Sequence, residues 1–297
     1  MTRREFLSAA AAVTIPLRQT GSKLRFAVIT DVHHGLAPDS LDRMRAFVAE
    51  VKRRRGLDFV LQLGDFCHSN SEAETRPFLD LWNSIDLPKH HVLGNHDMDR
   101  GTKSDAMRLW GMPARFYAFE AGDYRFITLD LNHFKKAGKL HGYAHGNYFT
   151  DNATHNWADP EQLQWLEREL SKSRKPTIIL SHQPLGLREL DGRLAPEQDQ
   201  VMAILEKSPP VVACLFGHLH VDRLERERDI PCLCVNSASY FWQSGMHPYR
   251  DPLFAFVSLG DGQMRIEGRH SEFRKGQPKT SAAGCSASIA NRRLWLT

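Results

Sequence analysis

The chain has 297 residues, of which 41% are hydrophobic, and its formal net charge is +4. This length suits one large folded domain, or one domain with an insertion. The basic residues are scattered along the chain rather than gathered with aromatic side chains in a stripe, which argues against a protein that binds nucleic acid specifically.

The N-terminus carries a pattern typical of a bacterial export signal. Arg3 and Arg4 precede an Ala-rich apolar stretch at residues 7–15, as in twin-arginine signals. We therefore predict that residues 1–22 are a signal region, that the protein is exported to the periplasm, and that the export machinery is a partner. The alternative is an ordinary N-terminus on a cytoplasmic protein. The stretch is too short to span a bilayer, which needs ~20 apolar residues.

The five cysteines form no disulfide framework and no zinc-binding pattern. Cys214 lies inside an apolar run, and Cys232 and Cys234 alternate on one face of another predicted strand. We expect these three side chains to be packed in the interior rather than redox-active.

From residue 23 onward, apolar runs with the character of buried strands are followed at once by polar residues. A helical pattern lies between the first two runs, so the chain begins with a βαβ unit. In such α/β sheets the functional side chains lie on the loops at the carboxyl ends of the strands. The runs are 25–30, 58–63, 91–93, 176–180 and 211–216, and they lead to Asp31 and His33, Asp65, Asn95 with His96 and Asp97, His182, and His218 with His220.

These residues offer carboxylate, amide and imidazole ligands without a thiolate, a set that suits divalent first-row metals. Asp31 and His33 are two residues apart, so in an extended segment both would face one spot. Asp65 is the natural candidate to bridge two cations, which lie ~3.5–4 Å apart in enzymes that displace a phosphoryl oxygen. Each motif alone is commonplace, but their joint occurrence at strand ends predicts a dimetal site.

The remaining predicted elements carry none of the candidate metal ligands. We expect a helix near 104–110, paired strands at 116–119 and 125–129, and helices at 160–170 and 196–207, the first capped by Asp159 ahead of Pro160. Residues 133–158 show no periodicity and are either a flap over the metal site or a surface excursion. Strands follow at 253–259 and 264–267, and residues 274–297 have the composition of a loose tail.

Taken together, the motifs resemble those of the calcineurin-like metallophosphoesterase superfamily, whose pattern is Asp-x-His, Gly-Asp, Gly-Asn-His-Asp/Glu, His, and Gly-His-x-His. The resemblance implies a four-layer α/β/β/α sandwich over residues 23–273, with two mixed sheets and two divalent metal ions at the strand ends. It implies that Asp65 bridges the two ions. The first ion would be held by Asp31, His33, Asp65 and His220, and the second by Asp65, Asn95, His182 and His218.

The same resemblance assigns catalytic roles. His96 matches the histidine that binds phosphate and assists the leaving oxygen, and Asp97 matches the residue that orients its imidazole. Purple acid phosphatases carry a tyrosine ligand three residues after the bridging aspartate, whereas this chain has His68 there, and it keeps the His33 that they lack. A tyrosinate–iron(III) centre is therefore not expected.

The expected activity is hydrolysis of a small phosphomonoester or phosphodiester by metal-activated water. A cyclic-nucleotide phosphodiesterase or a diphosphatase on nucleotide conjugates is the alternative, and a non-catalytic metal or phosphate binder is less favoured because no ligand is missing. Four residues are candidates for substrate binding. His34 and Arg100 either contact the phosphate or have a structural role, and Tyr240 and Trp242 either stack on a ring of the substrate or belong to the core.

Overall fold

The computed structural model describes residues 23–69, 71–188, 194–208, 210–242, 245–274 and 286–296. The predicted signal region, residues 1–22, lies outside them. Within these ranges no helix has both the length and the apolar character needed to cross a membrane.

The first large sheet is mixed. Its first three strands in chain order are parallel, and the C-terminal strands add to β1 in antiparallel fashion. Across the sheet the order is β16 (Arg292–Trp295), β15 (Gln263–Gly268), β14 (Ala255–Gly260), β1 (Leu24–Ile29), β2 (Phe59–Gln62) and β3 (Lys89–His91).

The second large sheet is also mixed, with four parallel central strands and an antiparallel strand at each edge. Its order is β10 (Arg223–Glu227), β11 (Ile230–Cys234), β9 (Val211–Phe216), β8 (Thr177–Leu180), β5 (Tyr124–Thr128) and β4 (Tyr117–Ala121). Two small hairpins complete the strands: β6 (His133–Lys136) with β7 (Lys139–Gly142), and β12 (Tyr240–Trp242) with β13 (Met246–Pro248).

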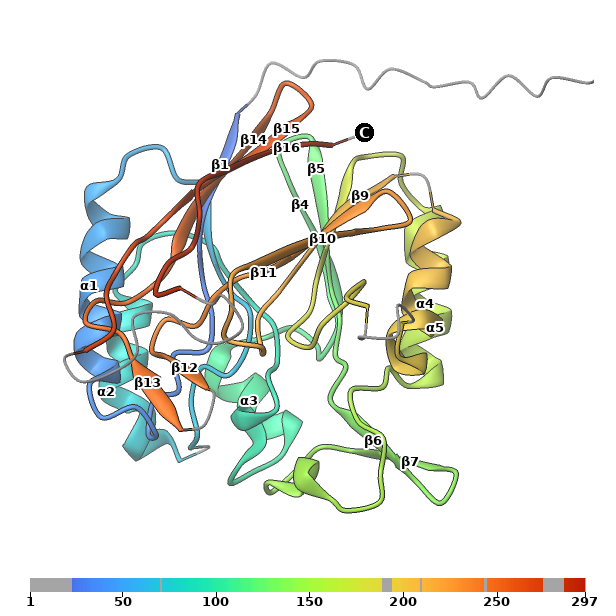
Figure 1. The fold of residues 1–297 in the computed structure, drawn as a ribbon, viewed down its shortest axis with the longest axis horizontal. Helices are drawn as coiled ribbons and strands as arrows, with labels where there is room; N and C mark the ends of the chain where they lie inside the picture. Colours follow the sequence, from blue (N-terminus) through green and yellow to red (C-terminus); the bar gives the residue numbers. More distant parts are fainter. Residues whose placement is uncertain are drawn as a thin grey trace, which may run out of the picture.

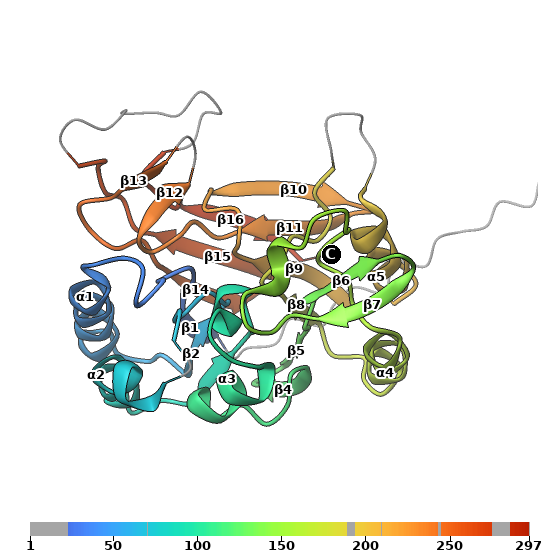
Figure 2. The same ribbon diagram turned by 90° about the horizontal axis from the view of Figure 1, so that it is seen from below.

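Helices cover the outer faces of both sheets. The longer ones are α1 (Ser40–Arg53), α2 (Glu72–Asn83), α3 (Lys103–Trp110), α4 (Pro160–Ser171) and α5 (Pro196–Glu206), and the 3₁₀ turns are η1 (His96–Met98) and η2 (Asn147–Phe149). Figures 1 and 2 show α1 and α2 on one outer side and α4 and α5 on the other. Asp159 caps α4 as predicted, because its side chain accepts from the backbone N–H of Gln162.

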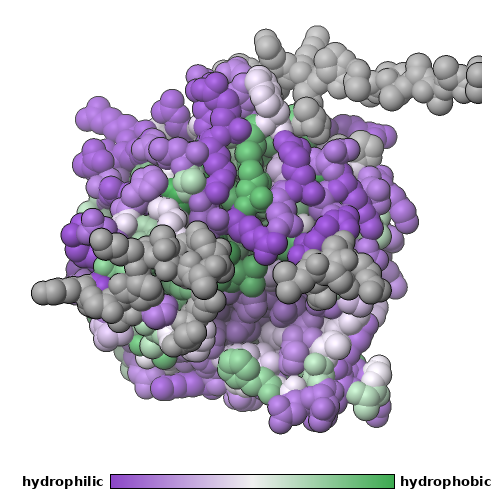
Figure 3. All heavy atoms as spheres, viewed as in Figure 1, coloured by the Kyte–Doolittle hydropathy of each residue, from purple (hydrophilic) through white to green (hydrophobic). Residues whose placement is uncertain are grey.

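Strand alternation creates three hydrophobic cores, and these produce the four layers. Phe26 points between the sheets, where its ring meets Phe126 edge-on with centroids 5.8 Å apart. Ile29 points to the opposite face and packs with α1 and α2, while Ile127 packs toward α4 and α5. The predicted α/β/β/α sandwich is therefore confirmed, and in the space-filling view a hydrophobic band shows between two largely hydrophilic halves (Figure 3).

The prediction that Cys214, Cys232 and Cys234 are packed in the interior is confirmed. Cys214, Cys232 and Cys234 are all buried in the core between the second sheet and its helices. Cys214 and Cys232 lie side by side on neighbouring parallel strands.

The C-terminal prediction was wrong for residues 286–296. This segment returns to the first sheet, where β16 pairs with β15, and its Ile289, Leu294 and Leu296 side chains are buried. The apolar residues of this edge strand follow a run poor in hydrophobic side chains, and that composition hid the strand in the sequence. The domain therefore extends past residue 273 and includes this strand.

The excursion, residues 133–158, is more regular than its sequence indicated. It contains the hairpin of β6 and β7 and the turn η2, and in Figure 1 it lies below the second sheet. The hairpin runs from His133 to Gly142 with a tight turn at Ala137 and Gly138, both of which have positive φ. Short strands rich in histidine and lysine carry little apolar alternation, so the pattern did not predict them.

His91, at the end of β3, makes the fold sensitive to acid. Its ring is buried and both ring nitrogens face N–H donors, Trp82 Nε1 at 3.3 Å and Gln62 Nε2 at 3.2 Å. Burial, with the neighbouring His90 and Lys89 adding to it, lowers the pKa of His91 to about 3. The unfolded chain, with a pKa near 6.5, therefore binds this proton first as the pH falls.

We expect the free energy of unfolding to fall between pH 6.5 and pH 3, with His91 contributing about 2 kcal/mol of the loss by pH 5. His91→Gln should flatten this dependence, whereas His141→Gln, at an exposed position, should leave it unchanged. Urea unfolding at pH 7 and pH 5 measures the difference, and an equally steep loss in His91→Gln would contradict the assignment.

Candidate dimetal centre

The predicted ligands converge at one edge of the sandwich, where strands of both sheets end. Asp31 and His33 follow β1, Asp65 follows β2, and Asn95 follows β3. From the second sheet, His182 follows β8, and His218 and His220 follow β9. The two sheets therefore contribute ligands to the same site.

The first ligand group is Asp31, His33, Asp65 and His220, whose donor atoms all lie within 4.8 Å of one another. His33 Nε2 is 3.0 Å from His220 Nε2, and His220 Nε2 is 3.0 Å from Asp31 Oδ1. All four residues are buried. This is the set that the resemblance implied for the first ion.

The second group is Asp65, His182 and His218. Asp65 Oδ2 lies 3.1 Å from His182 Nε2 and 3.9 Å from His33 Nε2, so one carboxylate oxygen faces both groups. His182 Nδ1 lies 2.8 Å from the Leu63 carbonyl, which fixes the ring with Nε2 toward the site. The shared position of Asp65 is what a bridging ligand requires.

Backbone N–H groups hold the outer oxygens of both aspartates. Asp31 accepts from the N–H of His218 at 3.1 Å and from the Thr30 hydroxyl at 2.6 Å. Asp65 Oδ1 accepts from the N–H of His96 at 2.8 Å. Each carboxylate is thereby oriented before any ion arrives.

The ligands converge for a different reason from the one predicted. Asp31 and His33 are not in extended backbone: both have a φ of 52°, in the left-handed region. Asp65, His218 and His220 also have positive φ, at 49°, 70° and 53°. Such conformations cost about 1–3 kcal/mol each outside glycine and concentrate at functional sites.

Two glycines allow the loops to approach closely. A Cβ atom on Gly94 would lie 2.1 Å from the backbone nitrogen of Asp65, and one on Gly217 would lie 2.5 Å from Asp31 Oδ2. Any larger residue at either position would therefore displace a ligand. This explains why a glycine precedes Asn95 and His218 in the motifs.

The residues fit a pair of metal ions. Asn95 Oδ1 is buried without a hydrogen-bond partner among the described residues, as suits a ligand atom. His182 Nε2 and His218 Nδ1 lie 3.2 Å apart, so two imidazole nitrogens face each other as His33 and His220 do. Burial lowers the pKa of His218 to about 4, which keeps its ring neutral and able to coordinate. Oxygen and imidazole donors of this kind suit divalent first-row metals.

His96 lies beside this group, and its ring centroid is 5.2 Å from that of His33. The carboxylate that contacts the His96 ring is that of Asp99, whose oxygens lie 3.1 Å and 3.2 Å from His96 Nδ1. Asp97, which was predicted to orient His96, instead accepts hydrogen bonds from the backbone N–H groups of Phe66, Cys67 and Gly94. Asp97 therefore shapes the loop, and the prediction that it orients His96 is corrected to Asp99.

Three further residues around His96 were not predicted. The Tyr148 hydroxyl of the excursion is 2.6 Å from His96 Nδ1, and the Phe149 ring centroid is 6.5 Å from that of His96. The ring of His68 stacks on His96 at 4.4 Å. Asp99 had a detectable signal, since it lies three residues after His96 and thus on the same face of a helical turn. Tyr148 reaches the site only through tertiary structure.

The predicted phosphate contacts, His34 and Arg100, have partners outside the two ligand groups. The His34 ring stacks on Phe78 and has Ser40 Oγ 2.9 Å from its Nδ1. Arg100 forms an exposed ion pair with Glu74 at 3.1 Å. Neither side chain has a metal ligand among the hydrogen-bond or ion-pair partners found in the described residues, and their role as phosphate contacts stays a prediction.

The two predicted aromatic residues have different positions. Tyr240 is buried, with its ring 5.1 Å from His33 and 5.0 Å from His220, so it packs beneath the first ligand group. Trp242 is 54% exposed, and its ring is 5.8 Å from Tyr240. Of the two, only Trp242 is placed to meet a ligand from solvent.

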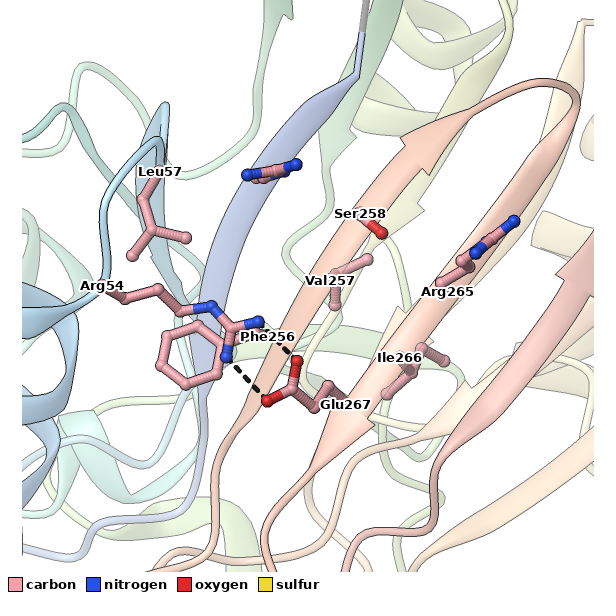
Figure 4. Close-up of a pocket in the computed structure, with 9 residues that line it drawn as sticks. Arg54, Leu57, Phe256, Val257, Ser258, Arg265, Ile266 and Glu267 are labelled. Carbon is pink, nitrogen blue, oxygen red and sulfur yellow. Dashed lines mark hydrogen bonds and ion pairs between the residues drawn. The ribbon is translucent and has the colours of Figure 1, made fainter.

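A pocket elsewhere on the first sheet is separate from this centre. It lies near the start of β1, whereas the ligands follow the end of that strand. The Arg54 guanidinium is 4.0 Å from the centroid of the Phe256 ring. Figure 4 shows it over that ring and paired with Glu267. These contacts satisfy Arg54 within the protein.

Comparison with known proteins agrees with this geometry. The family model described as calcineurin-like phosphoesterase matches residues 24–222, which contain every predicted ligand. The chain belongs to the calcineurin-like phosphoesterase family. It is therefore a hydrolase acting on phosphoric esters, with two divalent metal ions as cofactors.

Relatives of this phosphoesterase are named for several different substrates. A 3′,5′-cyclic-nucleotide phosphodiesterase of Nostoc is 26% identical over 74% of this chain and 80% of its own length. A manganese-dependent ADP-ribose/CDP-alcohol diphosphatase of Oryza sativa is 25% identical over 66% and 77%. A dimetal phosphatase from Danio rerio shares the fold, with a TM-score of 0.64 at 16% identity over 92% of this chain and 99% of that one.

Proposed function

We propose that this phosphoesterase hydrolyses small phosphodiesters whose leaving group carries a flat ring, such as a nucleoside. The observation that carries the proposal is a pair of exposed aromatic residues near the centre, one next to His96 and one next to Tyr240. Phe149 is 76% exposed beside His96, and Trp242 is 54% exposed beyond Tyr240. The relative named as a cyclic-nucleotide phosphodiesterase supports this substrate class, and the relative named as an ADP-ribose/CDP-alcohol diphosphatase supports a substrate that contains a nucleotide.

The residues supply the parts that a direct displacement needs. When bound, two divalent ions supply Lewis acidity, which lowers the pKa of water and offsets charge on the phosphate oxygens. Water attacks phosphorus as the bond to the leaving oxygen breaks. His96 gives its proton to that oxygen, and Asp99 keeps the ring oriented with Nδ1 away from the substrate. No covalent enzyme intermediate is required.

The first assay compares p-nitrophenyl phosphate, bis-p-nitrophenyl phosphate and cyclic AMP on metal-stripped protein refilled with Mn, Zn, Fe, Co, Ni or Mg. We expect a refilled enzyme to turn over the diesters faster than the monoester. A faster monoester rate would overturn the diester proposal. Two bound metals without turnover of any substrate would favour a non-catalytic binding protein.

Replacing the exposed rings tests the leaving group. Stacking on a base contributes ~1–3 kcal/mol, so Phe149→Ala and Trp242→Ala should each raise KM for cyclic AMP about tenfold. Neither should change KM for glycerophosphoethanolamine, which has no ring. Trp295→Ala removes an equally exposed tryptophan from β16 and serves as the matched control. Equal effects on both substrates would contradict the stacking role.

We further propose that the enzyme is exported by the twin-arginine route, which carries folded proteins and would allow metals to load beforehand. Support comes from Arg3 and Arg4 ahead of the apolar stretch at 7–15. Replacing both arginines by lysine should retain the protein in the cytoplasmic fraction. An unchanged distribution between fractions would refute this proposal without bearing on the activity.

A further inference from the structure

Asp99, a carboxylate outside the predicted ligand set, contacts three side chains around the metal centre. Its Oδ2 atom is 2.5 Å from His68 Nδ1, and both of its oxygens are within 3.2 Å of His96 Nδ1. The Tyr148 hydroxyl donates to its Oδ1. Since an ionised carboxylate only accepts, the hydrogens in these contacts belong to the imidazoles and the phenol.

His68 extends this arrangement to a metal ligand. Its Nδ1 carries the hydrogen donated to Asp99, so the Nε2 of the neutral ring has a lone pair. That atom is 2.7 Å from His33 Nδ1, which donates to it. His33 then presents an unprotonated Nε2 to the first ligand group, 3.0 Å from His220 Nε2 and 3.8 Å from Asp31 Oδ1.

The same logic applies directly to His96. Donation from its Nδ1 to Asp99 leaves Nε2 as the ring atom that exchanges a proton with the substrate. Stacking of His68 on His96, with ring centroids 4.4 Å apart, keeps the two imidazoles in fixed relation. One carboxylate thus sets the hydrogen positions on a metal ligand and on the proton donor.

We infer that Asp99 is a positioning residue that fixes the tautomers of His96 directly and of His33 through His68, with Tyr148 of the excursion holding the carboxylate in place. The inference rests on His33 being a metal ligand and is independent of the substrate class. It gives a role to His68, at the position where purple acid phosphatases carry a tyrosine ligand. Orienting partners of this kind change metal affinity 10–100-fold.

The test compares two replacements of His68 that differ in hydrogen bonding. Glutamine can accept from His33 through its oxygen and donate to Asp99 through its amide nitrogen, whereas leucine can do neither. In substrate-free titrations with Co(II), we expect His68→Leu to bind one of its two equivalents 10–100-fold more weakly, with an altered absorption spectrum. His68→Gln should stay within about threefold of the parent protein. His141→Leu, at an exposed histidine of β7, controls for general loss of imidazole.

Equal weakening in the leucine and glutamine variants would show that His68 only fills space and would overturn the inference. Parental affinity in His68→Leu would also overturn it, as would loss of a third Co(II) equivalent, which would make His68 a ligand. For Asp99→Asn we expect kcat to fall at least tenfold with KM unchanged. Because the metal titration needs no substrate, failure of the proposed phosphodiesterase activity remains a separate result.

Discussion

Asp65→Asn should empty both metal sites at once. The Asp65 carboxylate is shared by the two ligand groups, with one oxygen 3.1 Å from His182 Nε2 and 3.9 Å from His33 Nε2. An asparagine has no negative charge and only one oxygen, so it cannot bind two cations as the carboxylate can. We expect metal content to fall from two ions per chain to below one, and turnover to fall about 10³-fold or more.

Elemental analysis after dialysis measures the content, and a thermal melt followed by circular dichroism checks that the fold survives. Asp42→Asn removes an exposed carboxylate of α1 and should change neither the metal content nor the thermal melt. If Asp65→Asn retained both ions at parental affinity, the bridging assignment would be refuted.

His96→Ala should have the opposite signature, keeping both metals while losing most turnover. His96 is in neither of the two ligand groups that share Asp65, and its Nδ1 is engaged by Asp99. Loss of a general acid costs about 10²–10⁴-fold. The loss should be smaller for bis-p-nitrophenyl phosphate than for an alkyl diester, because p-nitrophenolate leaves without needing a proton.

His141→Ala replaces an exposed histidine of the excursion and is the control for loss of an imidazole. Loss of an ion from His96→Ala would contradict its non-ligand role. An equal loss for both leaving groups would instead argue that His96 binds phosphate without donating a proton.

The sequence predicts the candidate ligands because each follows an apolar strand closely, so strand and candidate ligand occur together in one short motif. Asp31, Asp65 and His182 were found in this way, and the structure brings them together. The strands meet at one edge by topology, which no local pattern specifies. The left-handed backbone of the ligands also escaped notice, since the motif residues give no sign of it.

What the sequence missed depends on distant contacts. Tyr148 contacts His96 from more than fifty positions away, in the turn η2, which follows a hairpin with little apolar alternation. Asp97 was predicted to orient His96 because it lies within the motif, yet its carboxylate accepts hydrogen bonds from the backbone N–H groups of Phe66, Cys67 and Gly94. The composition of the C-terminal residues does not predict strand β16, because that strand depends on its pairing with β15.

Because the candidate ligands are divided between the two sheets, loss of metal should affect how long the folded protein persists. Each ion would be held by both sheets: the first by Asp31 of one sheet and His220 of the other, the second by Asp65 and His182. The ions therefore cross-link the two halves of the sandwich much as a disulfide would, but reversibly. Chelation should open the seam between the sheets to proteases, and the supply of metal would then govern how long each molecule survives.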